Sequence, residues 1–221
     1  MKRNEQPVFL VQPTAVGAKI LEIAERERER EPDMFIDRNL DYGDTDYRAR
    51  QGIVGSRIRE FFVQGVQGDW ATLWDQKSKD AKPPWCAAFA SSCYRQAYAE
   101  LDLPLPMALK ANVSGLCAAL TRAGEDRLLS AEAVFDSDRL LRPQRPWTPG
   151  PGDLVLFRDH VALLRGIDSN GAIHTIEGNT YAFTDKQRPK RRVWGIFHKM
   201  YLPDKNPDRW NHLNFGLGAS R

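Results

Sequence analysis

The chain has 221 residues, of which 42% are hydrophobic and 28% are charged. This balance is typical of a globular protein and excludes a disordered chain, a collagen-like chain and a coiled coil. The net charge of +3 is too small an excess to indicate a nucleic-acid partner, although it is compatible with an anionic polymer as substrate.

The apolar runs are far shorter than the about 18 residues that span a membrane, so we expect no membrane insertion. Near the N-terminus, the apolar run Val8-Phe9-Leu10-Val11 is shorter than the core of a secretory signal, and we expect synthesis in the cytoplasm without a signal peptide. The cysteine count of 3 is odd and low, which excludes a disulfide scaffold and predicts at least one free thiol.

Helices are predicted first, where apolar residues recur three and four positions apart. They span residues 14–31, 53–64, 85–100 and 112–123. The first ends in an alternating run of Glu and Arg, Glu25 to Glu31, which is typical of a solvated helix end. Its inward face consists of Val16, Ile20, Ile23 and Ala24.

The segment between the first two predicted helices, residues 37–52, is rich in Asp, Tyr and Gly and predicts a loop. Its acidic residues Asp41, Asp44 and Asp46 do not follow the order of an EF-hand, which needs a central Gly and a closing Glu. We therefore expect no metal site there.

After Trp147 the pattern changes to turns and short strands. Strands are predicted at residues 153–157, 160–167, 172–177 and 192–198, and Asp168 to Gly171 is a hairpin turn between the second and third. Helices followed by consecutive antiparallel strands indicate an α+β fold. We predict an N-terminal segment 1–13, one domain over 14–202, and a loosely held polar tail over 203–221.

Cys86 stands at the first turn of the third predicted helix, directly after Pro84 and Trp85. The helix dipole and the unpaired backbone N–H groups there favour a thiolate, and the same N–H groups can stabilise an oxyanion. The alternative is a small buried hydrophobic residue, the usual fate of a free cysteine. We prefer that alternative for Cys93 and Cys117, which lie within apolar helix faces.

A nucleophilic cysteine needs a base, and the chain offers 4 histidines. His160 opens a predicted strand directly after a turn, a place at the rim of a sheet from which it can face a helix N-terminus. The others are less suitable, because His174 and His198 lie inside strands and His212 lies in the tail.

The orienting acceptor for His160 is predicted on the third strand. Glu177 and Asn179 alternate along it, so both can point to one face, and either can hold the imidazole. His174 would then lie on the opposite face, which argues against it as the base.

These residues resemble the motifs of the CHAP family, the cysteine, histidine-dependent amidohydrolases/peptidases of the NlpC-like, papain-like superfamily. Residues 84–89 (Pro-Trp-Cys-Ala-Ala-Phe) resemble the nucleophile motif of the family, and residues 151–157 and 160–164 resemble its strand pair. Residues 176–179 (Ile-Glu-Gly-Asn) resemble its strand end. The motifs occur in the family's order, and the resemblance covers most of the stretch from 14 to 200.

The resemblance implies a papain-like α+β fold, in which N-terminal helices pack on a C-terminal antiparallel sheet and the nucleophile lies at a helix N-terminus. It implies that Cys86, His160, Glu177 and Asn179 form the catalytic set, with no metal or organic cofactor. We also expect Trp85 to contact substrate. In a departure from the family, Asp159 replaces the usual Gly before the base, where it either raises the pKa of His160 or points to solvent. Residues 124–147 have no family counterpart and are expected to shape the substrate groove.

The activity that the resemblance implies is hydrolysis of an amide bond, usually in bacterial peptidoglycan, by an amidase or an endopeptidase. We expect delivery to the periplasm or cell wall, either as an antibacterial effector with a secretion apparatus and an immunity protein as partners, or as a phage-type lysin through a holin. One alternative is a papain-like toxin that acts on protein as a protease, deamidase or transglutaminase-type enzyme. The other is an inactive binding module on the same fold.

Overall fold

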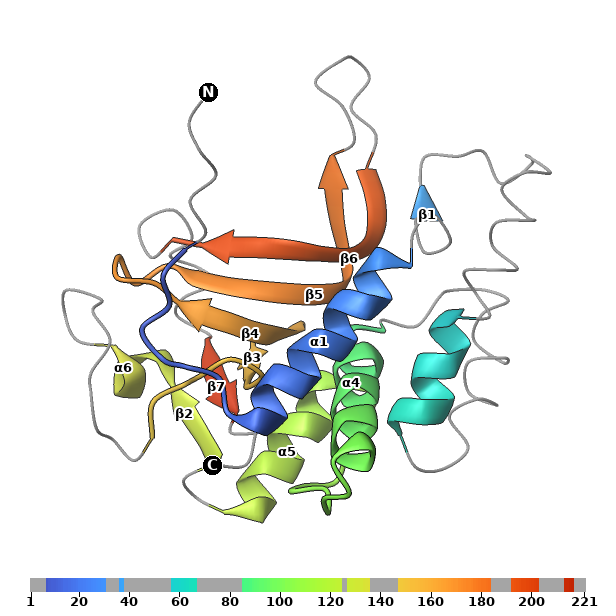
Figure 1. Ribbon diagram of the computed structural model, residues 1–221, viewed down its shortest axis with the longest axis horizontal. Coiled ribbons are helices and arrows are strands. Elements are labelled where there is room, and N and C mark those ends of the chain that lie inside the picture. Colours follow the sequence, from blue (N-terminus) through green and yellow to red (C-terminus); the bar gives the residue numbers. More distant parts are fainter. Residues whose placement is uncertain are drawn as a thin grey trace.

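The structure is a computed structural model, and the residues described here are 7–30, 36–37, 57–66, 85–124, 127–135, 147–183, 192–202 and 213–216. Figure 1 shows helices α1 (Ala15–Glu29), α4 (Cys86–Glu100) and α5 (Val113–Ala123) lying over one face of an antiparallel sheet. Helical residues 57–65, here called helix 57–65, lie on the outer side of α4. The predicted α+β class is confirmed.

Among the described residues, one 7-stranded sheet has the order β1-β6-β5-β4-β3-β7-β2, and every pairing in it is antiparallel. Its strands are β1 (Ile36–Asp37), β2 (Leu128–Ser130), β3 (Leu154–Leu156), β4 (Val161–Ile167), β5 (Ile173–Phe183), β6 (Arg192–Tyr201) and β7 (Asn214–Gly216). Strands β3 to β6 follow one another in sequence and form the centre. A short helix, α6 (Ala131–Val134), follows β2.

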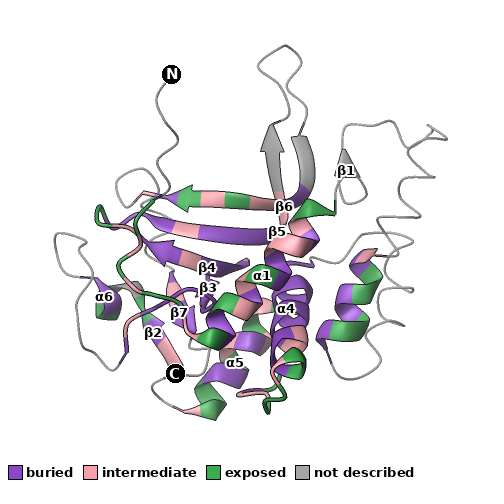
Figure 2. Ribbon diagram, in the orientation of Figure 1, coloured by how far each residue is buried: buried purple, intermediate pink, exposed green. Residues whose placement is uncertain are grey.

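Local sequence explains where the helices begin. The Thr14 hydroxyl accepts a hydrogen bond from the Gly17 N–H at 3.0 Å at the start of α1, and the Asn112 side chain accepts one from the Gly115 N–H at 2.6 Å at the start of α5. Such caps satisfy N–H groups that have no partner inside the helix. The predicted inward face of α1 is buried against α4 and the sheet. Figure 2 shows burial concentrated along α4 and the central strands.

The turn before β3 fastens the sheet to two helices. Gly152 has φ +92°, and a Cβ there would lie 2.4 Å from the Cα of Gly17 in α1, so only glycine fits. The Asp153 carboxylate accepts a hydrogen bond from the Gly150 N–H at 2.9 Å and holds the turn. The buried Tyr94 hydroxyl of α4 donates to the Gly152 carbonyl at 2.6 Å. The Pro-Gly-Asp motif therefore has a packing role.

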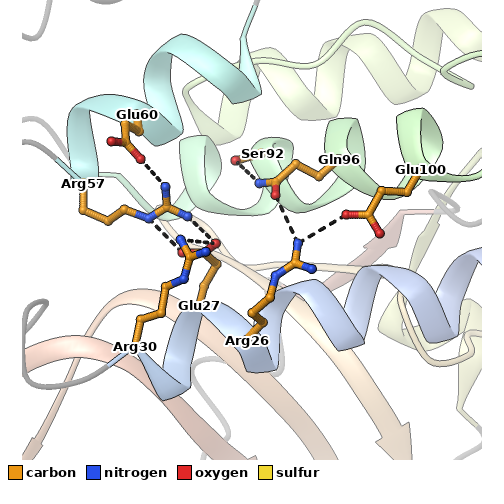
Figure 3. Close-up of polar contacts among 8 residues, drawn as sticks. All are labelled: Arg26, Glu27, Arg30, Arg57, Glu60, Ser92, Gln96 and Glu100. Atoms are coloured by element: carbon orange, nitrogen blue, oxygen red, sulfur yellow. Dashed lines mark hydrogen bonds and ion pairs between the residues drawn. The ribbon is translucent and has the colours of Figure 1, made fainter.

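The charged end of α1 is not wholly solvated, which corrects the prediction for this run. Glu27 is 1% exposed and pairs with Arg57 of helix 57–65, whose Nε lies 2.8 Å from Glu27 Oε2 (Figure 3). Arg30 lies 3.4 Å from the other oxygen of Glu27, and Arg57 also pairs with Glu60. Because helix 57–65 packs across this part of α1, it buries Glu27, and the paired guanidinium offsets the desolvation of the carboxylate.

The predicted tail contributes a strand, so the predicted domain boundary at residue 202 is too early. Strand β7 lies between β3 and β2, and Phe215 is fully buried. With Leu213 and Val155 it belongs to a second hydrophobic cluster. Val155 alternates with Leu154 and Leu156 of the main core, so this cluster lies on the sheet face opposite α4. Residues 213–216 are held because these apolar side chains complete that cluster.

Strand β2 and helix α6 both fall within residues 124–147, the stretch expected to shape a groove. Strand β2 forms an edge of the sheet beside β7, and the role of this stretch in a substrate groove stays a prediction. No helix in the described part of the chain has the length and apolar character needed to cross a membrane.

Candidate active site

Cys86 is the first residue of α4, and the residues around it fix the position of that helix end. Trp85 occupies the cap position, where its ring stacks on Phe61 with a centroid distance of 5.9 Å and meets Phe89 edge-on at 6.4 Å. Packed aromatic rings therefore fix the position of the start of α4. The sulfur of Cys86 lies at the positive end of the helix dipole, beside N–H groups that lack partners within the helix.

Gly178 of β5 is the point at which the start of α4 touches the sheet. A Cβ at this position would lie 2.7 Å from the Trp85 ring and 2.8 Å from Phe89, so a larger residue would push the helix away. Trp85 itself is only 2% exposed. The ring packs in the core, but Cys86 beside it is also only 3% exposed, so the contact of Trp85 with substrate stays a prediction.

His160 lies in the turn between β3 and β4, directly before Val161. Its Nε2 is 3.0 Å from Glu177 Oε2, and the ring is also hydrogen-bonded to Cys86. Because Glu177 occupies Nε2, we assign the hydrogen bond with the sulfur to Nδ1. The Phe157 ring stacks beside the imidazole with a centroid distance of 6.1 Å. The structure thus brings Cys86, His160 and Glu177 into one chain of hydrogen bonds.

Glu177 is an almost fully buried carboxylate, with 1% of its surface exposed. While Oε2 faces His160, Oε1 accepts hydrogen bonds from the Thr175 and Tyr201 hydroxyls, each at 2.6 Å. Burial by itself would raise the pKa of Glu177, but the hydrogen bond and charge of His160 and the two hydroxyl donors bring it below its ordinary value. Glu177 is therefore an anion at neutral pH.

The charge on His160 follows from its neighbours. Burial by itself would lower the pKa of His160, but hydrogen bonds and negative charge from Cys86 and Glu177 raise it to about 9. At neutral pH the ring is an imidazolium between a sulfur and a carboxylate. A cation beside the sulfur at a helix N-terminus is the environment in which a cysteine acts as a nucleophile.

Glu177 reaches His160 from an unexpected side. Ile176 and Gly178 belong to the sheet face that α4 covers, so alternation places Glu177 on the opposite face. The contact forms because His160 lies directly before β4. From there its ring reaches both Cys86 at the start of α4 and Glu177 on the sheet face opposite α4.

His174 lies away from Cys86, although not for the predicted reason. Alternation puts it on the same sheet face as Ile176, the face that α4 covers, but at the other end of β5. Its Nε2 is 3.0 Å from Asp168 Oδ2, and its ring meets Phe9 edge-on at a centroid distance of 5.3 Å. Position along the strand, rather than the face, separates it from Cys86.

Asn179 does not follow the alternation that was predicted to align it with Glu177. The pairing of β5 with β6 shifts between Glu177 and Thr180, and Asn179 has φ +56°. Asparagine is one of the few non-glycine residues that readily adopt this left-handed conformation, so it suits a bulge. Among the described residues it makes no hydrogen bond to Cys86, His160 or Glu177, and its catalytic role stays a prediction.

The remaining sequence candidates lie elsewhere. Asp159 is exposed, so of the two alternatives for it the structure favours pointing to solvent. Cys93 is fully buried, and burial raises the pKa of its thiol; Cys117 is half-buried. His198 Nε2 pairs with a Glu25 oxygen of α1 at 2.6 Å. His212 and the acidic residues Asp41, Asp44 and Asp46 lie outside the described residues.

Sequence reasoning missed Thr175, Tyr201 and Phe157. Thr175 could have been found, because it stands two residues before Glu177 and therefore shares its face. Tyr201 comes from the next strand, and the sequence carries no signal for which β6 residue lies beside Glu177. Across the described residues, no group of three or more His, Cys, Asp or Glu side chains is placed to hold a metal ion.

Comparison with known proteins adds no further assignment. No family model, no curated protein and no solved structure matches this chain. The site is defined by its own geometry, in which a thiol at a helix N-terminus, an imidazolium and a buried carboxylate are joined in that order.

Proposed function

We propose that this protein is a cysteine-dependent hydrolase that cleaves an amide bond in bacterial peptidoglycan. The observation that carries the proposal is the hydrogen-bonded chain from Cys86 through His160 to the buried anion Glu177. The order of parts is that of a nucleophile, its acid-base partner and an orienting group.

The chemistry follows from the positions of these groups. The Cys86 thiolate attacks the amide carbonyl, and the backbone N–H of Cys86 at the start of α4 is the oxyanion donor that we assign. As the carbon–nitrogen bond breaks, the His160 imidazolium gives its proton to the leaving amine, and a thioester remains on the sulfur. His160 then takes a proton from water, the hydroxide attacks the thioester, and an acid and the thiolate are released.

Glu177 contributes without touching substrate. Its negative charge stabilises the imidazolium, and its hydrogen bond to Nε2 leaves Nδ1 directed at the sulfur. In this scheme the proton moves between His160 and the reacting groups, while Glu177 stays ionised.

The choice of peptidoglycan rests on the sequence resemblance to the CHAP family, whose motifs fall on α4, β3, β4 and β5. The packing of the cysteine-bearing helix on an antiparallel sheet is consistent with a papain-like fold, which we include in the proposal. We further propose that the enzyme acts in the periplasm or cell wall as a delivered antibacterial effector or phage-type lysin.

The decisive experiment incubates purified sacculi with the wild-type protein and with Cys86→Ala, and identifies soluble muropeptides by mass spectrometry. Release by the wild type alone supports the proposal, and the masses tell an amidase from an endopeptidase. Cys117→Ser is the matched control, because it removes a half-buried thiol outside the site and should leave release unchanged.

Alkylation with iodoacetamide separates the alternatives if no muropeptides appear. A Cys86 thiol that reacts much faster than a small-molecule thiol, without release from sacculi, contradicts the wall substrate and favours an enzyme acting on protein. Slow alkylation together with no release favours the inactive binding module.

A further inference from the structure

The two oxygens of Glu177 have separate partners, and only one of them faces the reacting groups. Oε2 faces His160 at 3.0 Å, whereas Oε1 receives the hydroxyls of Thr175 and Tyr201, each at 2.6 Å. A carboxylate only accepts hydrogen bonds, so both hydroxyls must donate to it. Hydrogen bonds of this length to a charged oxygen are at the strong end of the range.

The donors come from two strands and are themselves buried. Thr175 precedes Glu177 on β5 and is fully buried, while Tyr201 stands at the end of β6 and is 7% exposed. Two donors from different directions fix the rotation of the carboxylate as well as its position. Water is not needed to satisfy Oε1.

An aromatic contact connects Tyr201 to the imidazole by a second route. The Tyr201 ring packs on Phe157 with a centroid distance of 5.0 Å, and Phe157 stacks beside His160. Contacts therefore run in a closed ring from Tyr201 through Glu177 and His160 to Phe157 and back. A shift of Tyr201 would be felt on both sides of the imidazole.

The groups that face the Glu177 carboxylate come from β5, from β6 and from the turn before β4. They are Thr175 on β5, Tyr201 on β6 and His160 before β4, with the Cys86 sulfur of α4 beyond the imidazole. Lys199 pairs with Thr175 across β5 and β6, but its ammonium lies over the Phe197 ring at 5.9 Å. Among the described groups, the charge that directly contacts the Glu177 carboxylate is that of His160.

We propose that Tyr201 and Thr175 are positioning residues that keep Glu177 ionised and turned toward His160. They thereby set the lowest pH at which the Cys86–His160 pair stays reactive. This inference rests on the proposed active site, but it does not depend on which substrate that site takes. Removing a donor leaves a buried carboxylate less stabilised, so Glu177 takes up a proton at higher pH and stops supporting the imidazolium.

The test measures the titration of Glu177 directly. The full chain is labelled with glutamate carrying ¹³C at the side-chain carboxyl, and the Glu177 signal is assigned by its loss in Glu177→Gln. We expect Tyr201→Phe and Thr175→Val each to raise the titration midpoint by about one pH unit, because each loses one hydrogen bond to a charged group. Thr175→Ser keeps a hydroxyl and should restore the wild-type midpoint.

The control is Tyr94→Phe, which removes another buried tyrosine hydroxyl with a 2.6 Å hydrogen bond, in this case to the Gly152 carbonyl. It should lower stability and leave the Glu177 midpoint unchanged. The pH dependence of Cys86 alkylation is the second readout, and its acid limb should move upward in Tyr201→Phe and Thr175→Val but not in Tyr94→Phe.

An unchanged Glu177 midpoint in both folded variants, or an equal rise in Tyr94→Phe, would overturn the inference. The two proposals can fail separately. Midpoints that move as expected in a protein that releases no muropeptides would sustain the positioning roles and contradict the wall hydrolase. Release of muropeptides with unmoved midpoints would do the reverse.

Discussion

Two histidine–carboxylate pairs involve β5, and they have the same nitrogen–oxygen distance but different surroundings. His160 and Glu177 are 3.0 Å apart at one end, and His174 and Asp168 are 3.0 Å apart at the hairpin end. Asp168 also accepts the backbone N–H groups of Asn170 and Ala172, so its carboxylate holds the turn. Glu177 holds the imidazole that faces a thiol. Distance alone therefore does not distinguish the pair that we propose to be part of a reactive site from a structural one.

The two carboxylates differ in burial, although the His160 side chain, at 17% exposed, is no more buried than that of His174, at 12%. The side chain of Asp168 is 15% exposed, against 1% for Glu177. Burial would raise the pKa of Asp168, but His174 and the two backbone donors lower it, and water shares in solvating the charge. A pair of that kind contributes about 1 kcal/mol or less to stability. Removing one partner of a buried pair leaves an uncompensated charge and costs about 3–5 kcal/mol.

The largest expected effect separates the two pairs by activity. Cys86→Ala and His160→Ala should each abolish muropeptide release from sacculi while circular dichroism shows an intact fold, because one removes the proposed nucleophile and the other its proposed acid-base partner. His174→Ala should retain most activity. Full activity in His160→Ala, or complete loss in folded His174→Ala, would contradict the assignment of the base.

Removing the charge of each carboxylate sharpens the comparison. Glu177→Gln should lower kcat/KM by about 100-fold or more, since an amide N–H facing Nε2 favours the tautomer whose proton lies on Nδ1, toward the sulfur. Asp168→Asn at the hairpin is the matched change and should alter kcat/KM by about twofold at most, as expected for a turn outside the site. Comparable losses in the two variants would argue against a special role for Glu177.

The pH dependence of the site pair comes next in size. The folded pKa of His160 is about 9, against 6.5 for an unperturbed histidine. The imidazolium therefore contributes stability that is fully present below pH 6.5 and is lost as the pH rises through about 9. We expect kcat/KM to fall above about pH 9, where the ring can no longer protonate the leaving amine. A profile that falls near pH 6.5 would contradict the charge assigned to His160.

The smallest expected effect is on stability at the hairpin. His174→Ala removes the partner of a partly solvated carboxylate that keeps its two backbone donors, so the free energy of unfolding should fall by about 1 kcal/mol or less. Urea denaturation at neutral pH measures this difference. A loss near that of His160→Ala would show that the hairpin pair is as critical to the fold as the site pair.

Much of the local structure follows from the sequence alone. The helix faces, such as Ile20 with Ile23 in α1, repeat every three or four residues, and that spacing depends only on helix geometry. The same holds for the place of Cys86 at a helix start and for His160 after a turn. Chemistry tied to a position within one element could therefore be predicted.

Only the tertiary structure decided which distant residues complete these positions. Tyr201 reaches Glu177 through the register of β6 on β5, and the bulge at Asn179 breaks an alternation that local pattern suggested. Likewise Glu27 becomes buried because helix 57–65 brings Arg57 to it. Strand register and helix packing are determined by contacts between elements far apart in sequence, and no local periodicity records them.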